Sequence, residues 1–296
     1  MNFRTDLALE RHETITEEDK EGINFESVTE CGMKISRITV KTKRAAEKLG
    51  KPEGRYSTLE IPFLKDSGDV RSDAIEIFAR EVSCLLPEKG TVLVAGLGNK
   101  RITLDALGPE CIEKLLATRH ITPEIASSIG FSPLRSVAGI IPGVLGNTGI
   151  ETAEILSGIT SKIGPSALIV IDALAARSTE RLGTTVQMCD TGVCPGAGVG
   201  NKRSRIDEKS MGVPVIAIGV PTVVDGVTMT LDFIEKSGIS VDRKTKEDYL
   251  RGERGMMVTP KEIDSVISRA ATFIAMGINK AMQPHIPTED LFAIMA

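Results

Sequence analysis

Short apolar runs rich in β-branched residues alternate with amphipathic patterns over the second half of the chain. Runs of this kind, flanked by glycine and followed by a helical pattern, are typical of strands buried in a parallel sheet. The predicted strands cover residues 91–95, 137–141, 167–171, 184–188 and 213–219, and the predicted helices cover residues 106–117, 150–163 and, after the third strand, 173–177. This alternation predicts an α/β fold, a three-layer sandwich around a mostly parallel sheet.

The N-terminal third of the chain has a different pattern. Residues 33–40 and 56–63 alternate apolar and polar positions, which predicts two half-buried strands. Helical patterns occupy residues 41–49 and 70–86. Residues 10–25 are acidic and weakly patterned, and we predict an irregular leader there. The two strands predict an N-terminal antiparallel portion of the sheet.

A long helix is predicted near the C-terminal end. The segment Thr259-Pro260-Lys261-Glu262 has the order of a capping box with proline at the first helical position, and the helical pattern runs to about Met282. Before it, residues 237–255 are polar and charged, which predicts an exposed excursion too short to be a domain. We therefore expect one large α/β domain, which the length permits.

Composition and charge exclude several classes of partner. The chain has 296 residues, 41% of them hydrophobic, a net charge of −4 and no tryptophan. Nucleic-acid surfaces need basic patches and stacking rings, so we expect no direct contact with DNA or RNA. The longest apolar stretch, residues 213–224, is broken by glycine and proline and is too short to span a membrane. No signal peptide is recognisable at the start, so we expect a cytoplasmic protein.

Two aspartates stand where predicted strands end. Asp105 follows the strand 91–95 through a glycine-rich turn, and Asp172 directly follows the strand 167–171. Open α/β sheets bind ligands beyond the carboxyl ends of their strands, so both aspartates could face one crevice. Two carboxyl groups held close together in a partly dry cleft share one proton and can act together as acid and base. The alternative is that each aspartate only caps the helix after its strand.

Three other motifs are incomplete versions of known binding or catalytic sequences. The turn Gly96-Leu97-Gly98-Asn99 begins like a dinucleotide fingerprint, but Arg101 stands where the third glycine is needed. The segment 196–202 resembles a phosphate loop, but asparagine precedes its lysine and Arg203 replaces its Ser/Thr. The triplet Asp190-Thr191-Gly192 occurs in pepsin-like proteases, but it is present once and also fits an ordinary turn.

Metal and nucleophile chemistry receive little support from the sequence. The chain has three histidines and five scattered cysteines, without a Cys-x-x-Cys pair. These numbers favour neither a disulfide framework, nor a zinc site, nor a catalytic triad. We predict no metal and no cofactor, although Glu151, Asp190 and Asp225 leave a carboxylate metal site open as an alternative.

The ordered motifs of the chain resemble the spore germination protease family. The likeness covers most of the chain and begins at Arg4-Thr5-Asp6-Leu7-Ala8-Leu9-Glu10. The other matching blocks are Gly96–Asn99 with Asp105–Pro109, Pro142–Val144 with Gly149–Thr152, Ile171–Ser178, Asp190–Gly192 with Gly198–Arg203, Ile216–Asp225 and Met257–Glu262. Long matches in a fixed order are more specific than any single short motif.

The resemblance implies an atypical aspartic endopeptidase that cleaves small acid-soluble spore proteins during germination. Its two essential aspartates match Asp105 and Asp172. It further implies a homotetrameric zymogen in the forespore or spore core, which processes itself between Asp6 and Leu7. Residues 1–6 are then a propeptide, and residues 7–296 form a single α/β protease domain.

Several residues beside the two aspartates are candidates for binding substrate. Asn99 follows the glycine turn, and Lys202, Arg203 and Arg205 follow the glycine-rich loop, where they could recognise acidic residues near the cut. The alternative for the basic residues is a solvated turn. Two other functions also remain open: a metal-sensing endopeptidase similar to those of hydrogenase maturation, and a non-catalytic peptide-binding module.

Overall fold

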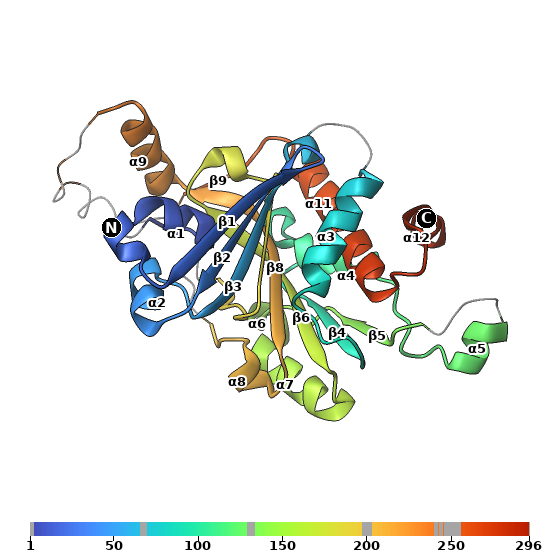
Figure 1. Ribbon diagram of the computed structural model, residues 1–296. Helices are drawn as coiled ribbons and strands as arrows, with labels where there is room; N and C mark the ends of the chain where they lie inside the picture. The colour runs from blue at the N-terminus through green and yellow to red at the C-terminus, as the bar shows by residue number, and fades with distance from the viewer. Residues whose placement is uncertain are drawn as a thin grey trace.

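A nine-stranded sheet forms the centre of the computed structural model, which describes residues 3–65, 70–128, 134–196, 203–239, 242, 245 and 256–295 (Figure 1). The strands are β1 (Ile23–Glu30), β2 (Met33–Val40), β3 (Gly54–Glu60), β4 (Val92–Gly96), β5 (Val137–Ile140), β6 (Ala167–Ala176), β7 (Thr185–Cys189), β8 (Val215–Asp225) and β9 (Met257–Val258). Their order is β1-β2-β3-β7-β8-β6-β4-β5, and β9 pairs with β8. Strands β8, β6, β4 and β5 run parallel to one another, whereas β1, β2, β3 and β7 pair antiparallel, and β7 and β9 are both antiparallel to β8.

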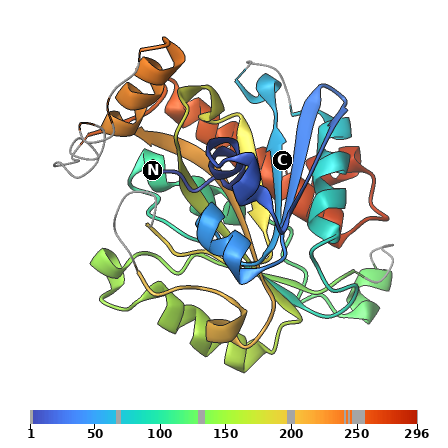
Figure 2. The ribbon, with the colours of Figure 1, turned by 60° about the vertical axis from the view of Figure 1, so that its left-hand side comes forward.

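Helices cover both faces of this sheet and make three layers (Figures 1 and 2). One face packs against α3 (Ser72–Ser83), α4 (Leu107–Glu113), α11 (Ile263–Met282) and α12 (Thr288–Met295). The other face packs against α1 (Ala8–Thr14), α2 (Lys43–Leu49), α7 (Thr152–Ile163) and α8 (Glu208–Met211). The other short elements are α5 (Pro123–Ser128), α6 (Leu145–Thr148), α9 (Gly226–Lys236), η1 (Glu17–Lys20), η2 (Pro62–Leu64), η3 (Thr103–Asp105) and η4 (Thr179–Arg181).

The alternation of side chains along each strand divides the core between these two faces. In β4, Val92 and Val94 pack toward α3, α4 and α11, whereas Leu93 and Ala95 pack toward α7 and α8. All four side chains are buried, because the strand lies between two helical layers. The same alternation decides which face each polar residue of β6 and β7 reaches.

The predicted fold class is confirmed. The molecule is an α/β sandwich of three layers, and its N-terminal strands form the antiparallel portion. The helices predicted over 70–86 and 150–163 correspond to α3 and α7. The strands predicted over 33–40 and 56–63 correspond to β2 and β3.

The prediction of an irregular leader at residues 10–25 is wrong. The structure has α1 there, and its Ala8 and Leu9 are buried against β2 and α2. The following strand, β1, was missed because it is an edge strand with a mostly exposed surface, on which even Phe25 remains 44% exposed. An edge strand of this kind lacks the apolar alternation that makes strands recognisable in a sequence.

Two other predicted elements have different ends in the structure. Residues 173–176 continue β6 instead of forming a helix, because pairing with β8 extends to the Ala176–Val224 pair and overrides the helix preference of alanine and leucine. The predicted capping box is also absent, since α11 begins at Ile263 without a side-chain cap. The Thr259 hydroxyl instead donates to the carbonyl of Thr222 (2.9 Å).

Most of the predicted excursion at 237–255 lies outside the described residues. Across the part of the chain that is described, no helix is both long and apolar enough to cross a bilayer.

Candidate active site

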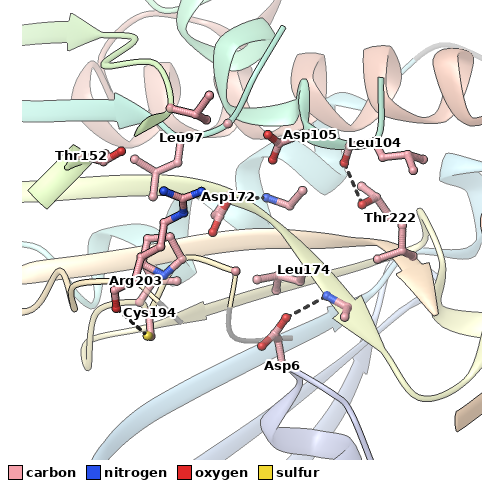
Figure 3. A pocket seen from close by; sticks show the side chains of 18 of the residues that line it. Asp6, Leu97, Leu104, Asp105, Thr152, Asp172, Leu174, Cys194, Arg203 and Thr222 are labelled. Carbon is pink, nitrogen blue, oxygen red and sulfur yellow. Dashed lines mark hydrogen bonds between the residues drawn. The ribbon is translucent and has the colours of Figure 1, made fainter. Parts of the chain in front are cut away.

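One cavity, of about 290 Å³, is lined by both Asp105 and Asp172 (Figure 3). It lies beyond the carboxyl end of β4, at the point where the neighbouring strand β6 continues past the end of β4. This is the crevice that forms at the carboxyl edge of parallel strands. The Arg203 side chain reaches in beside the two aspartates (Figure 3). The structure therefore brings together the two carboxyl groups that the sequence placed at separate strand ends.

Asp172 projects from the middle of β6 and is almost completely buried, with 8% of its surface exposed. The alternative that it caps a helix is wrong, because β6 continues past it. Burial raises the pKa of Asp172 well above its usual value, and the charges of Asp105 and Asp6 raise it further. The N–H of Ala173 donates to Asp172 Oδ1 (3.0 Å) and opposes this shift only in part. Asp172 is thus arranged to keep its proton.

Asp105 ends η3 and has a more polar environment. Its Oδ2 accepts a hydrogen bond from the N–H of Asn99 (2.8 Å), and α4 begins only after Ala106, so Asp105 is not a helix cap either. Burial raises the pKa of Asp105, but the Asn99 N–H and the charge of Arg203 act in the opposite direction. The pKa of Asp105 is thus raised less than that of Asp172, so of the two carboxyl groups Asp105 is the one that ionises more readily.

The glycine turn after β4 holds Asp105 in this position. Gly98 has a φ of +110°, and a Cβ atom there would lie 2.1 Å from the Asp105 carbonyl oxygen and 2.9 Å from its Oδ1. Only glycine fits this conformation and this close approach. The motif that resembled a dinucleotide fingerprint thus serves to place Asp105.

Of the four candidate substrate-binding residues, only one is described as lining the cavity of the two aspartates. Arg203 lines the cavity of the aspartates. Arg205 binds Asp207 and the Thr191 carbonyl and borders a neighbouring cavity. The side chain of Asn99 turns away to accept from the N–H of Arg101 (3.1 Å). Lys202 lies outside the described residues.

The triplet Asp190-Thr191-Gly192 forms a turn. Asp190 accepts hydrogen bonds from the backbone and the guanidinium of Arg55 (2.7 and 2.8 Å), which joins this turn to the start of β3. Gly192 has a φ of +70° and packs against the backbone of Ile206 and Asp207. These contacts make the triplet a structural turn.

The N-terminal segment lies alongside β6, next to the aspartates. The N–H of Asp6 donates to the Ala175 carbonyl (2.8 Å), and the N–H of Ala175 donates to Asp6 Oδ2 (2.8 Å), as Figure 3 shows for the latter bond. Leu7 is fully buried in a cluster that includes Leu174 and Val224. The peptide bond between Asp6 and Leu7 is therefore held in an extended segment beside Asp172.

Two residues that the sequence analysis missed contact this same peptide. Lys51 Nζ (2.6 Å) and Gln187 Nε2 (3.0 Å) both donate to the carbonyl oxygen of Asp6. With Asp6 and Asp172, they border a second cavity of about 200 Å³. The signal that was available is Gln187 itself, a buried amide within the otherwise apolar end of the β7 sequence Val186–Cys189.

Among the residues that the structure describes, no group of three His, Cys, Asp or Glu side chains is placed to hold a metal ion. The arrangement instead offers two carboxyl groups with unlike surroundings on one cavity. Such a pair can remove a proton from water and donate another to a leaving group.

Comparison with known proteins agrees with the sequence resemblance. The family model of germination proteases matches residues 4–250. A germination protease from Caldanaerobacter subterraneus subsp. tengcongensis is 42% identical over 98% of this chain and 97% of its own length. Those of Clostridium perfringens (41% identical, 98% of each chain) and Priestia megaterium (37% identical, 99% of this chain and 96% of the relative) are similarly close.

Among solved structures, a [NiFe] hydrogenase maturation protease, HycI from Thermococcus kodakarensis KOD1, aligns with a TM-score of 0.37 and 16% identity. The alignment covers 67% of this chain and 98% of that one.

Proposed function

The chain belongs to the germination protease family, peptidases of spore-forming bacteria, and on that premise we propose that it hydrolyses peptide bonds with Asp105 and Asp172. One observation carries the proposal: both carboxyl groups line one cavity, and burial with a neighbouring charge raises the pKa of only one of them well above its usual value. A pair of this kind is the acid and base that attack by water requires.

The surroundings of the two aspartates suggest a role for each. Asp105, ionised, accepts a proton from a water molecule, and the water oxygen attacks the carbonyl carbon of the peptide. Asp172, protonated, donates its proton to the leaving nitrogen as the C–N bond breaks. The proton that Asp105 took from water then passes to Asp172, and the product carboxylic acid releases its own proton to the freed amine or to solvent. The pair thereby returns to an ionised Asp105 and a protonated Asp172 for the next turnover.

We further propose that the enzyme is made as a zymogen and cleaves itself between Asp6 and Leu7. This is supported by the extended backbone of the segment beside Asp172 and by the buried position of Leu7. An acidic side chain before the cut is accommodated by the N–H of Ala175, and an apolar one after it by the Leu7 pocket. After processing, the same positions are available to other protein segments.

The proposed substrates are the small acid-soluble proteins of the spore, and the proposed working state is a homotetramer in the spore core. Both proposals follow from the resemblance to the germination protease family. Arg203, which faces the cavity, is the residue that we assign to acidic groups of the substrate.

The test is to incubate the purified full chain at mildly acidic pH, with and without a chelator, and to follow its mass and its N-terminal sequence. We expect loss of residues 1–6 at the same rate in both samples, followed by cleavage of added small acid-soluble spore protein. Cleavage that the chelator abolishes would instead indicate a metal-sensing endopeptidase of the hydrogenase-maturation kind. Absence of cleavage in both samples would indicate a peptide-binding module.

A further inference from the structure

The carbonyl oxygen of Asp6 is held by two side-chain donors. Lys51 Nζ approaches it to 2.6 Å and Gln187 Nε2 to 3.0 Å. Gln187 uses the other end of its amide to accept from the N–H of Ala8 (2.6 Å), so one side chain fixes the backbone on both sides of Leu7. The orientation of the Asp6–Leu7 peptide is therefore set by groups outside the segment itself.

The sheet places Gln187 and Asp172 in one row. Gly219 of β8 is in register with Asp172 of β6 and also with Gln187 of β7. Residues in register on adjacent strands point to the same face, and two strand spacings separate the outer pair by roughly 10 Å. Gly219 contributes no side chain between them, and Leu174 packs over the glycine, where a Cβ atom would lie 2.6 Å from its Cγ. Asp172, Gln187 and Asp6 all line the cavity beside this glycine.

We infer that Lys51 and Gln187 form the oxyanion-binding site of this enzyme, which receives the carbonyl oxygen of the residue before the cut. The inference rests on the proposed function, because it requires that the Asp6–Leu7 peptide is a substrate of the aspartate pair. Lys51 and Gln187 would stabilise the negative oxygen that forms during the reaction. The two aspartates cannot do this, because both aspartates are engaged in proton transfer.

The step that these donors assist is the addition of water. As the water oxygen bonds to the carbonyl carbon, the C=O electron pair moves onto the oxygen, which becomes negative, and the water proton passes to Asp105. The N–H groups of Lys51 and Gln187 stabilise this negative oxygen. When the intermediate collapses, the electron pair re-forms the C=O bond, the C–N bond breaks, and the nitrogen of Leu7 takes the proton of Asp172.

The surroundings of the two donors favour this use. Gln187 is buried and Lys51 is partly buried, and burial lowers the pKa of Lys51 while the nearby Asp6 carboxylate opposes that effect. Donors that are fixed and shielded from water stabilise a developing charge more strongly than donors in solvent.

The experiment measures the first-order rate of cleavage between Asp6 and Leu7 in the full chain. Lys51→Met removes one donor, and Gln187→Glu removes the other while it keeps an acceptor for Ala8. Each is expected to slow cleavage by about 10²- to 10³-fold, the usual cost of one oxyanion donor. Lys51→Arg, which keeps a cationic donor, is expected to stay within about tenfold of the wild-type rate.

Two controls separate this effect from loss of structure. Lys48→Met alters an exposed lysine that pairs with Asp19 at the surface, and it should cleave at the wild-type rate. Hydrogen exchange of residues 5–9 should remain as slow in Lys51→Met and Gln187→Glu as in the wild type, because the segment is also held by Ala175 and by the Leu7 pocket.

Wild-type rates in both variants would overturn the inference, and so would slow cleavage accompanied by rapid exchange of residues 5–9, since the pair would then only anchor the segment. The proposed function fails separately. It fails if the wild-type chain does not cleave, or if Asp172→Asn cleaves like the wild type.

Discussion

Replacing Asp172 with asparagine is expected to lower the rate of peptide hydrolysis by at least about a thousandfold and to raise the melting temperature at neutral pH. The rate falls because asparagine cannot donate a proton to the leaving nitrogen, a step whose loss commonly costs 10²- to 10⁴-fold. The melting temperature rises because burial and two like charges raise the pKa of Asp172 in the folded chain. The folded state therefore holds the Asp172 proton more tightly than the unfolded chain does, and this difference opposes folding at every pH above the unfolded pKa.

Both effects can be measured on one preparation, as the initial rate of peptide cleavage and as thermal unfolding at pH 7 and at pH 3. The gain in melting temperature should shrink at pH 3, where Asp172 is protonated in both states. Asp264→Asn, at the exposed first turn of α11, is the matched control and should change neither quantity. An unfolded or strongly destabilised Asp172→Asn chain would mean that the aspartate serves the fold, and rapid cleavage would mean that it is not the acid.

Asparagine at position 105 is expected to reduce hydrolysis by a similar factor, of about a thousandfold, for a different reason. The amide oxygen can still accept the N–H of Asn99, so the turn after β4 should keep its shape. The amide has no basic group to take a proton from water, so the attacking oxygen is no longer activated. The measurement is kcat for a peptide that spans residues 3–12, after the N-terminal segment has been removed.

The comparison variant for Asp105 is Asp207→Asn, an aspartate that caps the short helix α8 away from the pair. Its kcat should stay near that of the wild type, with only a small loss of stability from the weakened cap. A folded Asp105→Asn enzyme that keeps most of its kcat would contradict the role of Asp105 as the base.

Much of the fold and both aspartates of the site can be predicted from the sequence, for one physical reason. Strands buried on both faces must be apolar throughout, so β4 and the first half of β6 are visible as runs such as Val92–Ala95. The carboxyl ends of parallel strands meet at one edge of the sheet, and this rule predicts that Asp105 and Asp172 face one crevice. Asp172, however, was expected at a strand end and is in fact inside β6, since the extension of that strand depends on β8.

The remaining parts of the site depend on contacts between distant segments. In the sequence, Lys51 is indistinguishable from an ordinary surface lysine that follows a helix. The Asp6 carbonyl comes within reach of it only because residues 5–8 pack against β6. The buried acid Glu10 is similar, because it accepts the N–H groups of Arg177 and Ser178 across the fold. No pattern within residues 10–25 indicates that partner, so the segment looked irregular.

The central claim is that Asp105 and Asp172 hydrolyse peptides while they share one proton. The pH dependence of kcat/KM for the processed wild-type enzyme tests it most directly. We predict a bell-shaped profile. Activity is lost toward acid pH as Asp105 gains a proton, and toward alkaline pH as Asp172 loses the proton that burial and its neighbours help it to keep. A rate that rises steadily with hydroxide concentration through neutral pH, without an upper limb, would contradict the account.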